Sequence, residues 1–362
     1  MQLRTVQSLL IVGLFLLSAP LMLTASYATT CGSGQTCGTL YFTIIGGSVD
    51  TTAFTYDSVA HTVSFAPSLL ASGLSGGADG IIRDSVTHNL MVGVNCGGGT
   101  SINEISPTTG YLVSTISTPG VDPSHIMADV AGNAWYSADG CGSSNQGKVA
   151  FGSSTGSAVT LTGDDSFVNT IVWNSLTNNE NLAYYTSGAC CAGGGHFGTL
   201  DTTTMTTTCV KVSGECESFP GAHGEIFDPY TGDIIIVGGN HITQIDPTSL
   251  SVVSDLIVPG FNALDQGAVD GQGHLFVANN GGSIFFLDYS TTKQVNNVAN
   301  FAKNIGCCFN GNPDDVAPLV GPGSTTQVPQ FPLGILTLFA LAIPGLIFIR
   351  ARISPKFTRA HA

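Results

Sequence analysis

The sequence predicts an all-β protein built from repeated four-stranded units. A related segment recurs every roughly 40 to 55 residues. In each copy a short apolar stretch ends in Asp or Asn, a turn rich in Gly, Asn and Thr follows, and a second apolar stretch comes next. The copies are GIIRDSVTHNLMVGVN (80–95), HIMADVAGNAWYSADG (125–140), TIVWNSLTNNENLAYYTSG (170–188), GEIFDPYTGDIIIVGGN (224–240) and GAVDGQGHLFVANNG (267–281). Third and fourth apolar stretches follow most copies without helical periodicity, which is typical of a β-propeller.

The N-terminus is typical of a secretory signal peptide. Arg4 supplies the positive start, residues 9–17 are apolar, and Ser26-Tyr27-Ala28 has the small-x-small pattern of a cleavage site. We therefore expect residues 1–28 to be removed after Ala28. A retained N-terminal anchor is the alternative.

Residues 29–320 are expected to form the propeller domain. Five complete blades start near Ile81, Ile126, Ile171, Ile226 and Ala268. Residues 39–70 lack an innermost strand, whereas residues 315–319 resemble an innermost strand with nothing after it. Joining the two closes the ring and removes the free strand edges that invite aggregation. The sequence predicts six blades, with seven as the alternative.

The C-terminus predicts a membrane anchor. After a linker at 321–330, residues 331–349 carry no charge over 19 positions, about the length that spans a bilayer. The tail at 350–362 is basic, which marks the cytoplasmic side. The protein is thus expected at the cell surface, with a single membrane pass and the propeller outside. The segment Pro329-Gln330-Phe331-Pro332 resembles the PEF-CTERM class of archaeal sorting signals, but Gln330 replaces its acidic residue, so cleavage of the anchor stays open.

The charge distribution argues against nucleic acid as a partner. All 24 acidic residues lie between the two apolar ends, and only five of the 10 basic residues do. A domain this acidic repels phosphate backbones. We expect an extracellular protein or a small ligand as the partner of the propeller, and the membrane as the partner of the C-terminal helix.

All cysteines lie in the exported part, where an even number predicts disulfides first. Cys31 with Cys37, and Cys209 with Cys216, have the spacing of local loop staples. The motif CCAGGGH (190–196) is interpreted as a stapled loop that carries His196, and a thiolate metal site or free thiols are the alternatives. The remaining disulfide candidates are Cys96, Cys141, Cys190, Cys191, Cys307 and Cys308.

A ring of polar residues is expected around one mouth of the central channel. Alignment on the Asp or Asn that ends each innermost strand places one residue of every blade in this ring, with His125 and Gln266 beside it. The predicted ligand-binding face is Asp79, Ser124, Asn169, His223, Asp265, Gln266 and Asp314. Within it, the candidate metal ligands are Asp79, His125, His223, Asp265 and Asp314. The sequence identifies no cofactor with certainty. Carboxylates suit Ca²⁺ or Mg²⁺, and imidazoles suit Zn²⁺ or Cu²⁺. The alternative to a metal site is that these polar residues only line a water-filled channel.

The repeat DPSHIMADVAGNAWYSADGCGSSNQGKVAFGSSTG (122–156) resembles the blades of streptogramin (virginiamycin B) lyase-like propellers. The segment GDIIIVGGNHITQIDPTSLSVVSDLIVPG (232–260) resembles YVTN and NHL-type repeats of surface propellers. The first resemblance implies a histidine, His223 or His125, that acts as a base beside Mg²⁺ in an elimination.

Two hypotheses for the function therefore stand. The first is an anchored binding or scaffold propeller at the cell surface. The second is a metal-dependent lyase or hydrolase. Since no complete catalytic motif is present, the sequence favours the first and leaves enzymatic activity uncertain.

Overall fold

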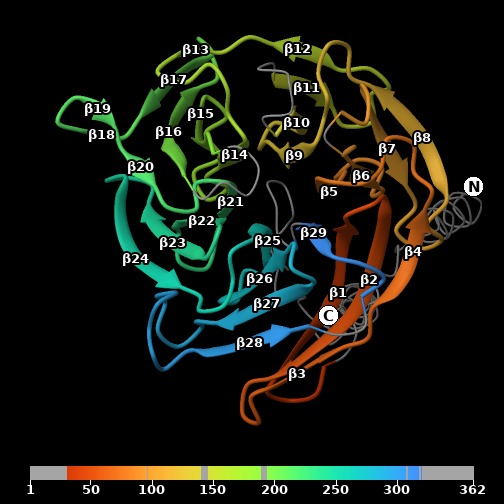
Figure 1. Ribbon diagram of the computed structural model, residues 1–362, viewed down its shortest axis with the longest axis vertical. Helices are drawn as coiled ribbons and strands as arrows, with labels where there is room; N and C mark the ends of the chain where they lie inside the picture. Colours follow the sequence, from red (N-terminus) through yellow and green to blue (C-terminus); the bar gives the residue numbers. More distant parts are fainter. Residues whose placement is uncertain are drawn as a thin grey trace, which may run out of the picture.

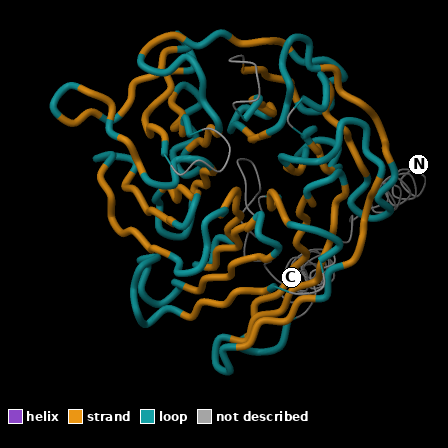
Figure 2. Tube along the Cα trace, in the orientation of Figure 1, coloured by secondary structure: helices purple, strands orange, loops and turns teal. Residues whose placement is uncertain are grey.

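The fold is a ring of β-sheets. The computed structural model describes residues 31–95, 97–139, 146–188, 194–306, 309–317 and 319. Within these ranges every regular element is a β-strand, and the strands form six blades around a central axis (Figure 1). Figure 2 shows the same part of the chain as strands joined only by loops. The prediction of a six-bladed all-β propeller is confirmed.

Five blades follow one another along the chain, each running from its innermost to its outermost strand. Blade 1 consists of β5 (Ile81–Arg83), β6 (Leu90–Val92), β7 (Ser101–Ile105) and β8 (Leu112–Ser117). Blade 2 consists of β9 (His125–Ala128), β10 (Asn133–Ser137), β11 (Gln146–Ala150) and β12 (Ser157–Val159). Blade 3 consists of β14 (Thr170–Trp173), β15 (Leu182–Thr186), β16 (Gly195–Asp201) and β17 (Thr206–Cys209).

Blades 4 and 5 have the same organisation. Blade 4 consists of β21 (Gly224–Phe227), β22 (Ile234–Gly238), β23 (His241–Asp246) and β24 (Ser251–Ile257). Blade 5 consists of β25 (Leu264–Val269), β26 (His274–Asn279), β27 (Ser283–Asp288) and β28 (Phe301–Ile305). In β22 the run Ile-Ile-Ile-Val is buried on both faces, because neighbouring blades cover each side of the sheet.

Blade 6 joins the two ends of the domain. Its innermost strand is β29 (Pro313–Val316), which pairs with β1 (Gln35–Ile44) through Phe42 opposite Val316. The outer strands are β2 (Ser48–Asp57), β3 (Thr62–Phe65) and β4 (Ser68–Ser72), and both β3 and β4 pair with β2. The C-terminal innermost strand and the N-terminal outer strands therefore close the ring, as the sequence predicted.

Four short strands decorate blade 3. β13 (Thr162–Gly163) pairs with β17, and β20 (Ser218–Phe219) pairs with β16. β18 (Lys211–Val212) and β19 (Glu215–Cys216) form a hairpin at the rim (Figure 1). The Cys209–Cys216 disulfide joins the end of β17 to this hairpin. The Cys31–Cys37 disulfide joins the segment before β1 to β1 itself, so both predicted local disulfides are present.

The apolar core lies between the blades. Each of six clusters of buried side chains is shared by two adjacent blades. Trp135 of blade 2 meets Trp173 of blade 3 with ring centroids 5.5 Å apart, and Phe54 of blade 6 meets Phe276 of blade 5 at 4.8 Å. Because each blade buries both faces in this way, the six innermost strands are held around one axis.

The ends of the chain lie outside the described residues. Residues 1–28, 321–330, 331–349 and 350–362 therefore keep their sequence-based assignments as predictions. Where the structure does describe the chain, it contains no helix of the length and hydropathy needed to cross a membrane.

Candidate metal centre

The start of each innermost strand brings one polar residue to the same end of the axis. Adjacent innermost strands contact one another around the whole ring, so these residues face a common centre. None of them is more than 9% exposed. They are Asp79, Ser124, Asn169, His223, Asp265 and Asp314.

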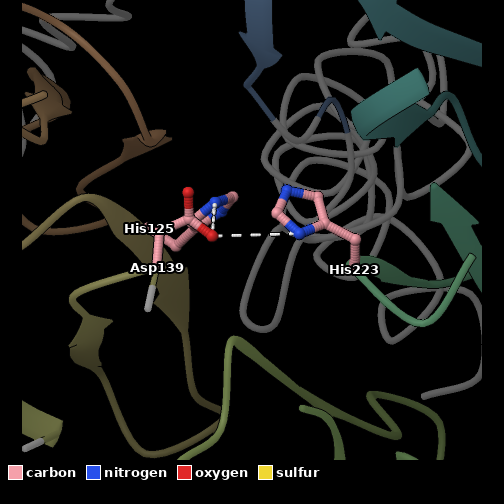
Figure 3. A group of neighbouring side chains, drawn as sticks. All are labelled: His125, Asp139 and His223. Carbon is pink, nitrogen blue, oxygen red and sulfur yellow. Dashed lines mark ion pairs between the residues drawn. The ribbon is translucent and has the colours of Figure 1, made fainter. Parts of the chain in front are cut away.

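Two buried histidines meet at this centre. His125 begins β9 and His223 precedes β21, and their rings lie edge to face with centroids 5.0 Å apart. The carboxylate of Asp139 lies between them (Figure 3): its Oδ1 is 3.5 Å from His125 Nε2 and 3.8 Å from His223 Nδ1. Two imidazoles and a carboxylate are thus gathered from blades 2 and 4 within 4.8 Å of one another.

A second group of three includes the opposite edge of the His125 ring. Nδ1 of His125 lies 3.6 Å from Asp315 Oδ2. Asp79, which precedes β5, completes the group, in which ligand atoms again lie within 4.8 Å of one another. This group draws on blades 1, 2 and 6.

His223 has a close acidic partner on its other side. Its Nε2 is 2.6 Å from Asp265 Oδ1, and Asp265 Oδ2 accepts a hydrogen bond from Asn280 Nδ2 at 2.8 Å. The Asn169 side-chain amide lies 2.8 Å from His223 Nδ1. That amide can donate to the neutral ring or, turned over, accept from the charged ring. Both nitrogens of His223 are therefore occupied. We call the histidines and the five carboxyl groups here the axial cluster: Asp79, His125, Asp139, His223, Asp265, Asp314 and Asp315.

Burial and crowding shift the acid–base properties of the axial cluster. Burial, followed by the charges of neighbouring carboxylates, raises the pKa of Asp79, Asp314 and Asp315 well above the usual range. Burial would lower the pKa of His125, but Asp139 and other carboxylates outweigh it and raise the pKa to about 9.

The pKa values of the His223–Asp265 pair move apart. Burial lowers the pKa of His223, yet the carboxylate of Asp265 raises it above the ordinary value. For Asp265, burial raises the pKa, but the two imidazoles lower it by more, so that the pKa falls from 3.8 to about 2. These opposite shifts favour the charged forms of both partners, whereas the raised pKa values of Asp79, Asp314 and Asp315 favour their protonated forms unless a cation replaces the protons.

The structure leaves Gln266 out of the axial cluster. Its side-chain amide binds the backbone of Glu225 in the neighbouring blade, accepting from the N–H at 2.9 Å and donating to the carbonyl at 3.3 Å. Ser124 lies at the ring and its hydroxyl oxygen is buried without a hydrogen-bond partner among the described residues.

Two members of the axial cluster escaped the sequence analysis. Asp139 follows β10 on the loop that leads to β11, which the alignment of the innermost strands does not cover. Asp315 neighbours the predicted Asp314, and strict strand alternation would turn it away from the axis. The β1–β29 pairing shifts register between Phe42 and Ile44, so that alternation does not hold at this point.

His196 of the CCAGGGH motif is not simply carried on a loop. Its Nδ1 is 2.9 Å from Asp165 Oδ1, and Tyr185 donates to the other oxygen of Asp165 at 2.6 Å. The disulfide candidates Cys96, Cys141, Cys190, Cys191, Cys307 and Cys308 lie outside the described residues.

Fold and site together define a six-bladed β-propeller with a buried His/Asp cluster at one end of its axis. No family model matches the chain, and no curated protein matches it. Among solved structures, a chain of the nidogen/laminin complex is similar at 10% identity and a TM-score of 0.56, over 78% of this chain and 98% of that one. At this identity the likeness shows the fold alone.

Two further structures have lower TM-scores. Hydrazine synthase from Kuenenia stuttgartiensis is 12% identical, with a TM-score of 0.49 over 78% of this chain and 89% of that one. A catalytically inactive virginiamycin B lyase from Staphylococcus aureus with quinupristin is 14% identical, with a TM-score of 0.46 over 76% and 93%.

Proposed function

We propose that this propeller is a binding module of the cell surface that holds a divalent cation in its axial cluster. The observation that carries the proposal is the convergence of His125, Asp139 and His223, whose ligand atoms lie within 4.8 Å of one another. Imidazole and carboxylate together suit a divalent first-row metal, and the surrounding carboxylates also suit Mg²⁺ or Ca²⁺. A cation there would link blades 2 and 4 across the axis through these three side chains.

The burial of the two histidines favours the binding of a small ion over catalysis on a large substrate. A general base needs a ring nitrogen within reach of the substrate proton. His223 faces Asn169 and Asp265, and His125 faces Asp139 and Asp315. Both side chains are only 2% exposed. This burial supports a small bound ion rather than proton transfer to a large substrate.

A metal-dependent lyase or hydrolase is the second candidate. The short His223–Asp265 contact is the observation in its favour, because a carboxylate that orients an imidazole is a common feature of catalytic bases. This candidate requires a substrate to displace one of the partners of His223. A cation bound through Nδ1 of His223 would likewise take the place of the Asn169 amide, which lies 2.8 Å from that nitrogen.

The two disulfides in the described chain support an exported domain, since such bonds persist in oxidising compartments. Together with the expected signal and anchor segments, they support a place at the cell surface. An extracellular protein or a small ligand is the partner we propose for the propeller.

Thermal unfolding of the purified protein tests the cation. After treatment with a chelator and its removal, Mg²⁺, Ca²⁺ or Zn²⁺ is added over a range of concentrations. We expect at least one of them to raise the Tm in proportion to the logarithm of its concentration, as a ligand of the folded state does. At 100 times Kd, such a ligand raises the free energy of unfolding by about 2.7 kcal/mol.

Variants locate the effect. The substitutions His223→Ala and Asp314→Ala should reduce the shift. The matched control is His241→Ala, which removes a histidine 3.0 Å from Asp255 on the outer strands of blade 4 and should leave the shift intact. A Tm that no cation changes in the unmodified protein would contradict the proposal.

A further inference from the structure

The two nitrogens of one imidazole face two different groups of ligands. His125 Nε2 lies 3.5 Å from Asp139, in the group that contains His223. His125 Nδ1 lies 3.6 Å from Asp315, in the group that contains Asp79. Because the nitrogens lie on separate edges of a rigid planar ring, the two groups mark separate positions in space.

We propose that the axial cluster holds two divalent cations bridged by the imidazole of His125. The first lies among His125 Nε2, Asp139 and His223, and the second among His125 Nδ1, Asp79 and Asp315. This inference rests on the proposed cation binding and adds a second ion to it. On binding, both nitrogens donate a lone pair to a metal, and the protons that they carried pass to water.

Once its carboxyl groups are ionised, the charge of the cluster favours more than one divalent ion. Five carboxyl groups are gathered there, and none is more than 9% exposed. One divalent cation would leave three of their negative charges without compensation in a buried site, where an uncompensated charge is costly. Two cations bridged by the deprotonated His125 ring would leave two, because that ring adds one negative charge, and Asp265, which has its own donor in Asn280, would carry one of them.

Unpartnered atoms on the Asp315 side point to a ligand at the second position. Asp315 is 2% exposed, and its Oδ1 has no hydrogen-bond partner among the described residues. Nδ1 of His125, which lies 3.6 Å from the other oxygen of Asp315, also has no hydrogen-bond partner among the described residues. Buried polar atoms are normally satisfied, so this open nitrogen and carboxylate oxygen indicate a place for a cation.

The donor sets indicate the chemical class of the ions. Two imidazoles and one carboxylate at the first position are typical ligands of Zn²⁺, Cu²⁺ or another divalent first-row metal. One imidazole and two carboxylates at the second position bind the same metals with more oxygen character. We therefore choose Cu²⁺ as the probe, because its unpaired electron reports whether two ions share a bridge.

Metal counting on the purified protein gives the first result. The metal-depleted protein is loaded with Cu²⁺, freed of excess metal by gel filtration, and analysed for copper per chain. We expect two equivalents, falling to one in Asp315→Asn and in Asp139→Asn. Both substitutions keep the size of the side chain, and unfolding curves confirm that the variants fold. The control His241→Ala should retain two.

Electron paramagnetic resonance gives the second result. Two ions that share the His125 imidazole should couple, so the doubly loaded protein should show less than half of the signal expected for two independent Cu²⁺ ions. Asp315→Asn should restore the full signal of one ion. His125→Gln should abolish the coupling.

The outcomes separate this inference from the proposed function. One equivalent in the unmodified protein, lost in Asp139→Asn but not in Asp315→Asn, overturns the second position and retains the cation site. Two equivalents with the full signal of independent ions overturn the bridge. The absence of any bound copper, zinc or magnesium overturns both proposals.

Discussion

The two ends of the innermost strands use aspartate in opposite ways. Where a strand runs into its hairpin turn, which we call the turn end, the carboxylate is surrounded by donors. Asp129 accepts from Ala131 N at 2.9 Å, from Asn133 N at 2.7 Å and from Trp135 Nε1 at 2.9 Å. At the other end, in the axial cluster, Asp315 keeps one oxygen without a partner among the described residues.

The difference lies in the supply of donors rather than in burial. Asp129 is 4% exposed and Asp315 2%. At the turn end, the backbone of the turn curls around the carboxylate and side chains of the next strand complete its shell. At the start of the strands, six loops arrive side by side and bring more acids than donors. A buried acid with a full set of donors holds the fold together, whereas a buried acid without one is a candidate ligand.

The largest effect is expected at the turn end. Asp129→Ala removes the acceptor of the buried Trp135 Nε1–H and of two backbone N–H groups. Each buried donor left without a partner costs about 1–3 kcal/mol. Since Trp135 is buried and Asn133 half-buried, whereas Ala131 is exposed, we expect a loss of about 2–4 kcal/mol. Urea unfolding measures it.

Asp246→Ala is the matched control for this substitution. Asp246 also accepts from two turn N–H groups, of Thr248 and Ser249, but those groups are exposed and water can replace the carboxylate. If Asp246→Ala lowered the free energy of unfolding as much as Asp129→Ala, the burial of the donors would not determine the size of the loss.

The axial cluster should make the metal-free protein sensitive to alkaline pH. The pKa of His125 is raised from 6.5 to about 9. Its contribution to stability, on the order of 3 kcal/mol, is therefore fully present below pH 6.5 and is lost as the pH rises through 9. The raised pKa values of Asp79, Asp314 and Asp315 act in the same direction, because the unfolded chain releases those protons first.

Urea unfolding between pH 5 and 9.5, with a chelator present, measures this dependence. Stability should fall across the range, less steeply in His125→Gln, and a saturating divalent cation should flatten the fall by replacing the protons. A stability that rises from pH 6.5 to 9 in the chelated protein would mean that the His125 ring is not held in its charged form.

A smaller effect is expected where blade 6 meets blade 5 at the turn end. Tyr56 donates to Asp288 Oδ2 at 2.5 Å, and Asp288 also accepts from Ser290 N at 2.9 Å. Since Asp288 keeps other donors, Tyr56→Phe should cost only about 1–3 kcal/mol. Tyr184→Phe is the control, because that hydroxyl donates to the uncharged carbonyl of Pro247 at 3.1 Å and should cost less.

The sequence was sufficient to predict the ring and its closure. Four apolar stretches per repeat specify a blade, and the missing innermost strand near residues 39–70 has its counterpart at β29. The repeated Asp or Asn also predicted which residues lie at the axial end of the innermost strands, because five residues separate it from each of them: Asp79, Ser124, Asn169, His223 and Asp265. This five-residue spacing is the same in each of these five blades, so it does not depend on small differences in strand twist.

Side-chain direction could not be predicted in the same way. Gln266 is adjacent to Asp265 and turns to the backbone of Glu225, whereas Asp315 is adjacent to Asp314 and stays in the cluster. The pairing of β25 with β26 shifts register between Leu264 and Gly267, and the pairing of β29 with β1 is also irregular. Such irregularities reset the alternation of side chains, and no repeat in the sequence marks them.

The smallest expected effect is the sharpest test of the comparison. His274 at the turn end resembles His125: it is buried, with Nδ1 2.5 Å from Asp270 and Nε2 3.6 Å from Asp288. Its acids differ because they have donors, such as Gln272 N at 2.8 Å from Asp270. We expect His274→Gln to lower the Tm yet leave the cation-dependent rise and the copper content unchanged, measured beside His223→Ala. If His274→Gln removed the rise as fully as His223→Ala does, a histidine between two acids would be sufficient to bind the ion. Carboxylate oxygens without hydrogen-bond donors would then not be what distinguishes the axial cluster from the turn end.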